Sequence, residues 1–197
     1  MLAVTEVLDQ DAGQLSPDSV AAVQLISAET SQLAVLIENL MEMSRFDAQA
    51  AELRTDEVDA ADNIRKTLAA RHWTDPREVT AELGDAIRAR LEPRRFDVVV
   101  ANLVGNALRH GRPPVVLKLT PLTRGGLDWF SLTVTDHGPG NSPEALPHVF
   151  ERFYKADVAR TRSAGSGLGL AIARENTRLH GGDLRAENAP GAVPSSS

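Results

Sequence analysis

Two asparagines, Asn102 and Asn106, lie four residues apart in a stretch that otherwise has the pattern of a helix. Asparagine is unfavourable inside helices because its short amide competes for backbone hydrogen bonds, and residues at i and i+4 share one face. Amide oxygens suit Mg²⁺ when the ion also keeps waters and binds phosphate. Asn106, supported by Asn102, is therefore a candidate metal ligand, with Arg109 reaching a phosphate. Capping of nearby backbone groups is the alternative.

Asp136 falls on the same face of a predicted strand as Leu132 and Val134. A carboxylate directed toward the apolar side needs a hydrogen-bond donor there. Gly138 and Gly140 follow it and allow the backbone to approach a ligand closely. This arrangement is typical of an acid that binds the amino group of a buried purine, although an acid that simply ends a strand gives the same pattern.

A glycine-rich segment opens the last predicted helix, with Gly165, Gly167 and Gly169 alternating with serine and Leu168. Such a turn exposes backbone N–H groups at a helix start that carries partial positive charge, and both features favour phosphate. The Gly-Lys-Ser/Thr of a Walker motif is absent from this segment. A flexible linker is the alternative interpretation.

Aromatic and basic residues fill the stretch between these two glycine motifs. Phe150, Phe153 and Tyr154 have the spacing of a short helix, and Arg152 and Lys155 add positive charge to an otherwise acidic chain. One interpretation is a surface helix followed by a mobile loop. The other is a nucleotide lid whose cations approach the phosphates when it closes.

The elements expected to position these residues alternate between helices and strands. They are a helix over 60–71, strands over 79–83 and 86–91, a helix after Pro93, strands over 115–119 and 127–135, a helix over 167–180 and a strand over 183–188. The sequence therefore predicts an α+β fold after residue 55, with a loop-rich stretch over 136–166.

The first 54 residues have a different pattern. Ser16 and Pro17 start a helix that nothing interrupts until about Leu53. Its apolar positions alternate spacings of three and four, as in a coiled coil: Val23, Ile26, Thr30, Leu33, Ile37 and Leu40. We expect an antiparallel hairpin with residues 1–11 that pairs again in a homodimer through the helix over 16–53; a monomeric bundle is the alternative.

Composition excludes several classes. The chain has 197 residues, 42% of them hydrophobic, with a net charge of -6, so it can bury a core but lacks the basic character of a nucleic-acid binder. It has no cysteine, which rules out disulfides and thiolate metal sites. No run reaches the roughly 18 apolar residues of a membrane span.

Taken in order, these motifs resemble those of the catalytic ATP-binding domain of sensor histidine kinases, in the larger family of gyrase, the Hsp90 chaperones and MutL. "NLVGNALRH" resembles the N box, "DHGPG" the G1 box, "FERFYKAD" the F box and "GSGLGLAIA" the G2 box. "LIENLMEMSRFDA" is similar to the second helix of the dimerisation and phosphoacceptor domain.

The resemblance implies a helical hairpin stalk without its histidine over 1–54, an α/β sandwich that binds ATP over 55–190, and a disordered tail over 191–197. It implies that the domain moves the γ-phosphoryl of ATP to a histidine and thence to an aspartate of a response regulator. The parent protein would be anchored in the membrane through an upstream sensor region, with this part on the cytoplasmic side.

By the same resemblance, each motif has a role at the nucleotide. Asn106 is the Mg²⁺ ligand with Asn102 beside it, and Asp136 recognises adenine. The other expected contacts are Arg109 and His110 at the phosphates or nucleotide, Gly138 and Gly140 around the base, Gly165, Gly167, Leu168 and Gly169 at the phosphates, and the lid cations Arg152 and Lys155.

The sequence also departs from the family pattern. No histidine precedes His72, so we expect that the chain begins beyond the phosphoacceptor motif, holds no catalytic histidine and does not autophosphorylate alone. Asn141 stands where an aliphatic residue is usual, Gly111 where a small hydroxyl residue is common, and the family's last strand is replaced by "PGAVPSSS". A non-catalytic dimerisation or regulatory module is the alternative function. A gyrase-type ATPase is disfavoured because Ala101 replaces the glutamate that would activate water.

Overall fold

The computed structural model describes residues 53–154 and 166–189, together with separate positions between Ser19 and Ser44. The chain divides into two units, Met1–Ser44 and Arg45–Ser197. The described positions of the first unit are all helical, as predicted for this part of the sequence. The helix expected over 1–11 and the tail expected over 191–197 lie outside the described residues.

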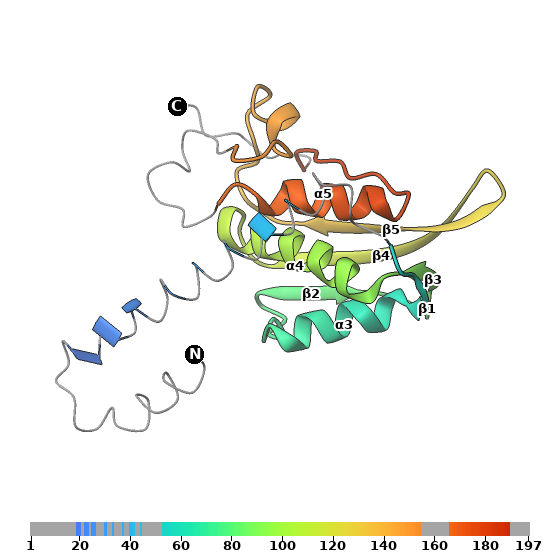
Figure 1. Ribbon diagram of the computed structural model, residues 1–197, viewed down its shortest axis with the longest axis horizontal. Helices are drawn as coiled ribbons and strands as arrows, with labels where there is room; N and C mark the ends of the chain where they lie inside the picture. The colour runs from blue at the N-terminus through green and yellow to red at the C-terminus, as the bar shows by residue number, and fades with distance from the viewer. Residues whose placement is uncertain are drawn as a thin grey trace. The chain divides into compact units, whose positions relative to one another are not determined.

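The second unit alternates strands and helices (Figure 1). In chain order these are β1 (Asp56–Asp59), α3 (Ala60–Ala70), β2 (Val79–Glu82), β3 (Arg88–Leu91), α4 (Pro93–His110), β4 (Val115–Arg124), β5 (Leu127–Thr135), the 3-10 helix η1 (Leu146–His148) and α5 (Gly169–Leu179). The structure confirms the three predicted helices, around 60–71, after Pro93 and around 167–180. It also confirms the predicted strands that correspond to β2, β3, β4 and β5. β1 was not anticipated.

The strand predicted over 183–188 is wrong. Polar side chains in this segment bind close to their own position: Asp183 accepts bonds from the N–H of Leu184 at 3.0 Å and from Arg185 Nε at 2.9 Å. Asn188 forms two reciprocal bonds of 2.8 Å with the backbone of Asn141. These contacts hold the segment against a loop through side chains, without the backbone ladder of a strand.

Three strands form the main sheet in the order β2–β4–β5. β2 is parallel to β4, and β4 is antiparallel to β5, with Leu117 opposite Val134. β1 and β3 form a separate antiparallel pair. Because β2 and β4 are parallel, the chain must cross over between them, and the crossover contains β3 and α4.

One face of the sheet carries the core. Along β4, Val115, Leu117 and Leu119 are buried and alternate with more exposed residues, as expected for a strand with one apolar side. They form one cluster with Ile64 of α3 and Val100 of α4. α4 packs between α3 and α5, so the helices form a layer beside the strands (Figure 1). This two-layer arrangement is the α/β sandwich that the family resemblance implies.

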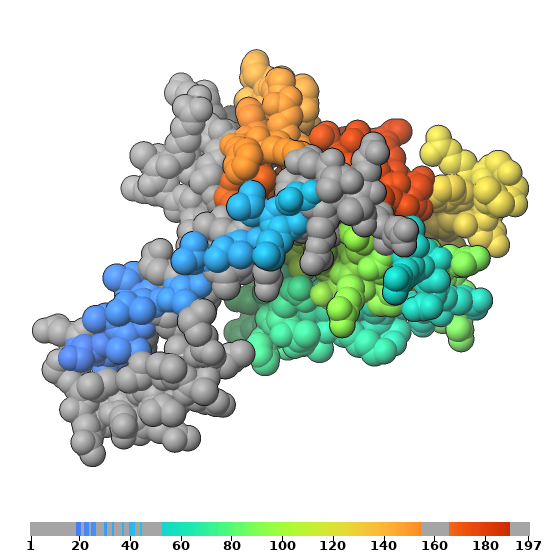
Figure 2. All heavy atoms as spheres, viewed as in Figure 1, coloured from blue at the N-terminus to red at the C-terminus, as the bar shows by residue number. Residues whose placement is uncertain are grey.

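The far half of the β4–β5 hairpin extends beyond the helix layer (Figures 1 and 2). Residues 120–129 are exposed on both strands, and a Gly125-Gly126 turn with positive φ at both residues joins them. The far half of the hairpin therefore contributes no side chain to the core. The near half of β5 leads into the loop that carries Asp136.

The bounds of α4 follow from local chemistry. Pro93 occupies the first turn, where its missing N–H costs nothing and its fixed φ suits a helix. At the other end the N–H of Gly111 donates to the carbonyl of Ala107 at 2.8 Å and closes the last turn. The helix has 18 residues, and the N box forms its second half.

Candidate functional site

Asn102 lies where α4 meets the start of α5. Its Nδ2 donates to the carbonyl of Val98, one turn earlier, at 3.0 Å. Its Oδ1 faces Gly169, the first residue of α5: a Cβ built on that glycine would lie 2.6 Å from this oxygen. Any larger residue at 169 would therefore collide with Asn102. The N box and the G2 box therefore meet at the contact between Asn102 and Gly169.

No side chain of residues 53–154 or 166–189 caps the first N–H groups of α5. Leu168, the residue before the helix, is buried, and its N–H donates to Ser166 Oγ at 3.3 Å. The side chain of Leu168 therefore packs in the core. The groups that remain available to a ligand at this helix start are backbone N–H groups. Free N–H groups together with the helix dipole make this end of α5 suitable for phosphate.

Asn106 and Arg109 follow on the next turn of α4. No hydrogen bond or ion pair joins either side chain to any residue within 53–154 or 166–189. Surrounding protein lowers the pKa of the Arg109 guanidinium by desolvation, although the group remains protonated near neutral pH. His110 ends the helix and makes a contact of its own.

Asp136 lies next to the end of α4. Its Oδ1 accepts a bond from the N–H of Gly138 at 2.7 Å. A Cβ built on Gly111 would lie 2.3 Å from the Asp136 Cγ, and one built on Gly138 would lie 2.7 Å from Oδ1. The carboxylate is therefore enclosed between two glycines, which fix its position while its second oxygen keeps an acceptor for a ligand.

The loop that carries Asp136 is tied to the residues after α4. The N–H of His137 donates to the carbonyl of Arg112 at 3.0 Å, and its Nδ1 contacts the carbonyl of Pro114 at 3.0 Å. Gly140 has a φ of 76°, which glycine adopts without strain. The G1 box is thus held directly beside the end of the N box.

The F box and the G2 box also meet. The N–H of Phe153 donates to the carbonyl of Gly167 at 2.9 Å, and a Cβ on Gly167 would lie 2.8 Å from the Phe153 carbonyl carbon. The short helix predicted from the aromatic spacing is wrong, because the 3-10 helix ends at His148 and turns follow it. Phe150 is buried with Arg174 over its ring at 5.6 Å, whereas Phe153 is exposed.

The remaining predicted site residues are only partly described. Arg152 is exposed and has an interaction of its own. Lys155 and Gly165 lie outside the described residues. The structure therefore brings together Asn102, Gly169, Gly167 and the F box on one side, and the end of α4 with Asp136, Gly138 and Gly140 on the other. Asn106 and Arg109 lie on α4 between these two groups.

Sequence reasoning missed two features of this region. In the sequence Gly111 is only a departure from the family pattern, but the structure gives it a steric role against Asp136. Asn141 is a departure of the same kind, and in the structure it binds Asn188. A glycine at a helix end is a recognisable signal, whereas the second pairing spans 47 residues and has no local signal.

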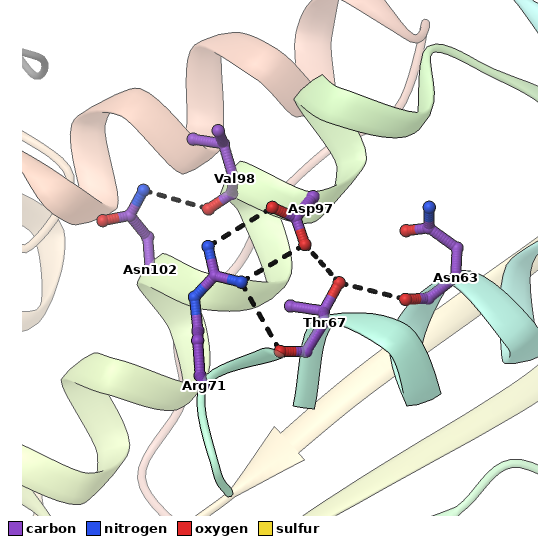
Figure 3. A network of polar contacts seen from close by, with 6 residues as sticks. All are labelled: Asn63, Thr67, Arg71, Asp97, Val98 and Asn102. Carbon is purple, nitrogen blue, oxygen red and sulfur yellow. Dashed lines mark hydrogen bonds and ion pairs between the residues drawn. The ribbon is translucent and has the colours of Figure 1, made fainter. Parts of the chain in front are cut away.

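A polar network lies on the flank of α4 that faces α3 (Figure 3). Arg71 donates to the carboxylate of Asp97 from Nη1 and from Nη2, each at 3.3 Å, and the hydroxyl of Thr67 donates to the same carboxylate. Asn102 points away from this network in the close-up view. The network therefore joins α3 to α4 and leaves the asparagine face of α4 to the site.

Among the described residues, no group of three or more histidine and acidic side chains has the placement of a metal centre. In the same residues, no helix is both long enough and apolar enough to cross a membrane.

Comparison with known proteins gives the family. Residues 91–194 match the family described as histidine kinase-, DNA gyrase B- and HSP90-like ATPase. The signal transduction histidine-protein kinase AfsQ2 of Streptomyces coelicolor is 47% identical over 98% of this chain, and the sensor histidine kinase MtrB of Mycolicibacterium paratuberculosis is 34% identical over 94%. The chain spans 37% and 33% of the length of these relatives.

A solved structure gives the same result. The mycobacterial sensor histidine kinase MprB is 31% identical, with a TM-score of 0.60 over 70% of this chain and 90% of that one. The matched family segment contains all four motifs and every contact described above between α4, α5 and the loop of Asp136. This chain belongs to the histidine kinase-, DNA gyrase B- and HSP90-like ATPase family and carries the ATP-binding domain of a sensor histidine kinase.

Proposed function

We propose that this chain binds ATP with Mg²⁺ and transfers the γ-phosphoryl group to a histidine of a phosphoacceptor domain. The observation that carries the proposal is the contact of Asn102 with the first residue of α5, which joins two motifs 67 residues apart at a helix start suited to phosphate. Within the described residues, no capping side chain binds these backbone N–H groups.

Asp136 recognises the base in this proposal. Its Oδ1 is already occupied by the N–H of Gly138, so the amino group of adenine donates to the other oxygen. The backbone of Gly111 and of Gly138 lies so close to the carboxylate that a side chain at either position would overlap it. The acid is therefore fixed before the nucleotide arrives, which lowers the entropic cost of binding.

Asn106 would hold Mg²⁺, and its surroundings fit that ion. Magnesium keeps several waters and usually takes one or two protein oxygens plus substrate phosphates. Asn106 makes no hydrogen bond within the described part of the chain, and no acidic cluster competes with it there. When bound, the ion would neutralise charge on the phosphates.

Phosphoryl transfer needs positioning and charge stabilisation more than covalent help from the protein. The N–H groups at the start of α5 would hold phosphate oxygens, and Arg109 would donate to them from α4. Both groups come from helices packed on the same core, so their separation is fixed by the fold. The chain would thus present the γ-phosphoryl in a defined direction.

The partners follow from the same proposal. The phosphoacceptor histidine would come from a separate phosphoacceptor domain. None of the five histidines of this sequence, which begin at His72, takes that role in the proposal. The phosphoryl group then passes to the receiver domain of a response regulator, on the cytoplasmic side of a membrane-anchored parent.

A homodimer would form through the first unit. Large apolar side chains are exposed along its helical positions in the single chain: Leu25, Ile26, Leu33, Ile37, Leu40 and Met41. Four of these six, Ile26, Leu33, Ile37 and Leu40, belong to the coiled-coil seam read from the sequence. Burying such a stripe against a second copy is strongly favourable.

The test supplies the missing acceptor. The chain is mixed with a purified histidine phosphoacceptor domain of a related kinase and γ-labelled ATP, with and without Mg²⁺. We expect label on the acceptor histidine only with Mg²⁺, and none when the acceptor carries His→Gln. Absence of label, with an acceptor that a complete kinase can phosphorylate, would contradict transfer by this chain.

A further inference from the structure

Arg109 lies back along α4 over Gly105. A Cβ built on Gly105 would lie 3.3 Å from Arg109 Nη1 and 3.6 Å from Nη2. The same point is 3.6 Å from Cη2 of Trp73, which comes from the loop after α3. Gly105 itself is buried, so the guanidinium and the indole edge converge on a gap that the missing side chain leaves in the helix surface.

The placement of Trp73 is fixed by the way α3 ends. His72 has a φ of 57°, the left-handed conformation that follows many helices. Its N–H donates to the carbonyl of Ala69 at 3.1 Å, and the N–H of Trp73 donates to that of Leu68 at 2.9 Å. This pair of bonds is the Schellman motif, in which the residue at the position of Trp73 also packs against the position of Leu68.

The ring of Trp73 is also in contact with a second arginine, Arg71. The guanidinium of Arg71 lies 5.9 Å from the ring centroid, within the range of a cation–π contact. Arg71 is itself bound to Asp97 of α4 in the network of Figure 3. Trp73 therefore belongs to a connected set of contacts that joins α3 to α4 and ends at the Gly105 gap.

The two arginines of this region differ in their charge balance. Arg71 is paired with a carboxylate, whereas no acidic side chain within 53–154 or 166–189 pairs with Arg109. Partial burial lowers the pKa of Arg109, although the residue as a whole is exposed, and no carboxylate of the described residues offsets that cost. An anionic ligand would supply that compensation.

We propose that Gly105 and Trp73 are positioning residues, which hold the guanidinium of Arg109 in one place on α4 for the phosphates of ATP. The inference rests on the proposed function and adds two residues to it. A guanidinium confined beside the helix loses less rotamer freedom when it binds phosphate. Neither residue touches the nucleotide in this account.

Gly105→Ala separates positioning from folding. Alanine is more favourable than glycine inside a helix, and the atom nearest the new methyl, Arg109 Nη1 at 3.3 Å, is at the end of a flexible side chain, so the melting temperature should rise. The displaced guanidinium should at the same time weaken ATP binding by about 3- to 10-fold, less than the loss of a whole charged hydrogen bond. Adenosine, which has no phosphate, should bind as before.

Trp73→Leu gives a second, independent variant, with Trp129→Leu on the β4–β5 hairpin as its matched control. We expect Trp73→Leu to weaken ATP but not adenosine, and Trp129→Leu to change neither. In the Arg109→Ala background, Trp73→Leu should have no further effect on ATP, because the group that it positions is gone. A structural role alone would lower the affinity for both ligands in either background.

A spectroscopic measurement completes the test. With Trp129→Phe, Trp73 is the only tryptophan in the chain. ATP should change its emission when the guanidinium beside it binds phosphate, and adenosine should not. If wild-type chain binds ATP no better than adenosine, the proposed function and this inference both fail. If it binds ATP better and the Gly105 and Trp73 variants match wild type, the inference alone is overturned.

Discussion

The two ends of α4 differ in what their polar side chains bind. At the N-terminal end, Arg95 donates to Glu92 at 3.1 Å and to Asn176 of α5 at 3.0 Å, and the N–H of Glu92 donates to His180 Nε2 at 3.0 Å. At the C-terminal end, Asn106 and Arg109 bind no residue of the described segments.

This difference separates stability from function within one helix. Polar groups that the protein itself satisfies stabilise the packing of α4 against α5, because buried donors and acceptors are costly when left alone. Polar groups that the protein leaves available are suited to a ligand. The comparison predicts that substitutions at the first end change unfolding, and those at the second end change nucleotide binding.

Asn176→Ala should give the largest effect on stability. Asn176 is fully buried, and its side chain accepts from Arg95 and donates to the carbonyl of Ile172 at 3.1 Å. Losing both bonds and the side-chain volume should lower the free energy of unfolding by about 2–4 kcal/mol. Urea denaturation measures this, with Asn188→Ala as a control expected to cost less than about 1 kcal/mol.

Unchanged ATP affinity in folded Asn176→Ala would sharpen the comparison. A loss of affinity in protein that is fully folded by circular dichroism would contradict the assignment of this end of α4 to stability.

Asn106→Ala should have the opposite profile. It removes the proposed Mg²⁺ ligand, so the affinity for ATP in the presence of Mg²⁺ should fall by about 10- to 100-fold, with unfolding nearly unchanged. Titration calorimetry with and without the ion measures the loss. Equal affinities of variant and wild type in Mg²⁺ would show that Asn106 does not hold the ion.

Gly111→Ser tests how tightly Asp136 is enclosed. The new Cβ would lie 2.3 Å from the Asp136 Cγ and 2.6 Å from the Ala107 carbonyl oxygen, so the carboxylate must move. Adenosine affinity should fall by about 10-fold, since a well-placed hydrogen bond to a charged group is lost. Unchanged affinity would mean that the loop of Asp136 can shift freely.

His72→Gly should stabilise the fold slightly. A non-glycine residue with a φ of 57° is strained, and glycine is the preferred residue at this position after a helix. We expect a gain of about 0.5–1 kcal/mol in the free energy of unfolding, with ATP affinity unchanged. Loss of stability would show that the histidine side chain makes a contribution larger than its strain.

The smallest effect concerns pH. Arg77 Nη2 donates to Asp75 Oδ2 at 2.7 Å, and the backbone N–H of Arg77 donates to the same carboxylate. These hydrogen bonds hold the pKa of Asp75 below its ordinary value. A carboxylate with a lowered pKa stabilises the fold above its unfolded pKa, and this contribution is lost as the pH falls through the folded value. Arg77→Met should therefore be slightly less stable than wild type at pH 7, and the gap should narrow as the pH falls below 3.8, the ordinary pKa of the carboxyl.

A gap that persists unchanged at pH 3 would mean that Arg77 contributes through packing and not through the ionised carboxylate. Urea denaturation at both pH values distinguishes the two.

Much of the fold could be predicted from apolar periodicity, and the errors have physical reasons. β1 has the sequence Asp-Glu-Val-Asp, which lacks apolar alternation; its pairing with β3 places Glu57 opposite Arg90 and Asp59 opposite Arg88. The ion pair across these strands joins Glu57 and Arg88 at 3.7 Å, and a strand with a single apolar residue gives little hydrophobic signal. Residues 183–188 had a strand-like composition, but side-chain bonds within the segment and to Asn141 determined its conformation.

The candidate site was predictable where it depends on motifs and unpredictable where it depends on steric fit. The order of the four motifs identified the residues that converge at the ends of α4 and α5. The pairing of Gly169 with Asn102, the enclosure of Asp136 by Gly111, and the position of Trp73 depend on distances across the fold. Sequence spacing cannot give such distances.

The central claim is that this chain forms a working Mg²⁺–ATP site from these converging groups. The most direct measurement is calorimetric titration of the wild-type chain with a non-hydrolysable ATP analogue, with and without Mg²⁺. The account predicts saturable one-to-one binding that strengthens with the ion. Absence of binding to a chain that melts cooperatively would contradict it.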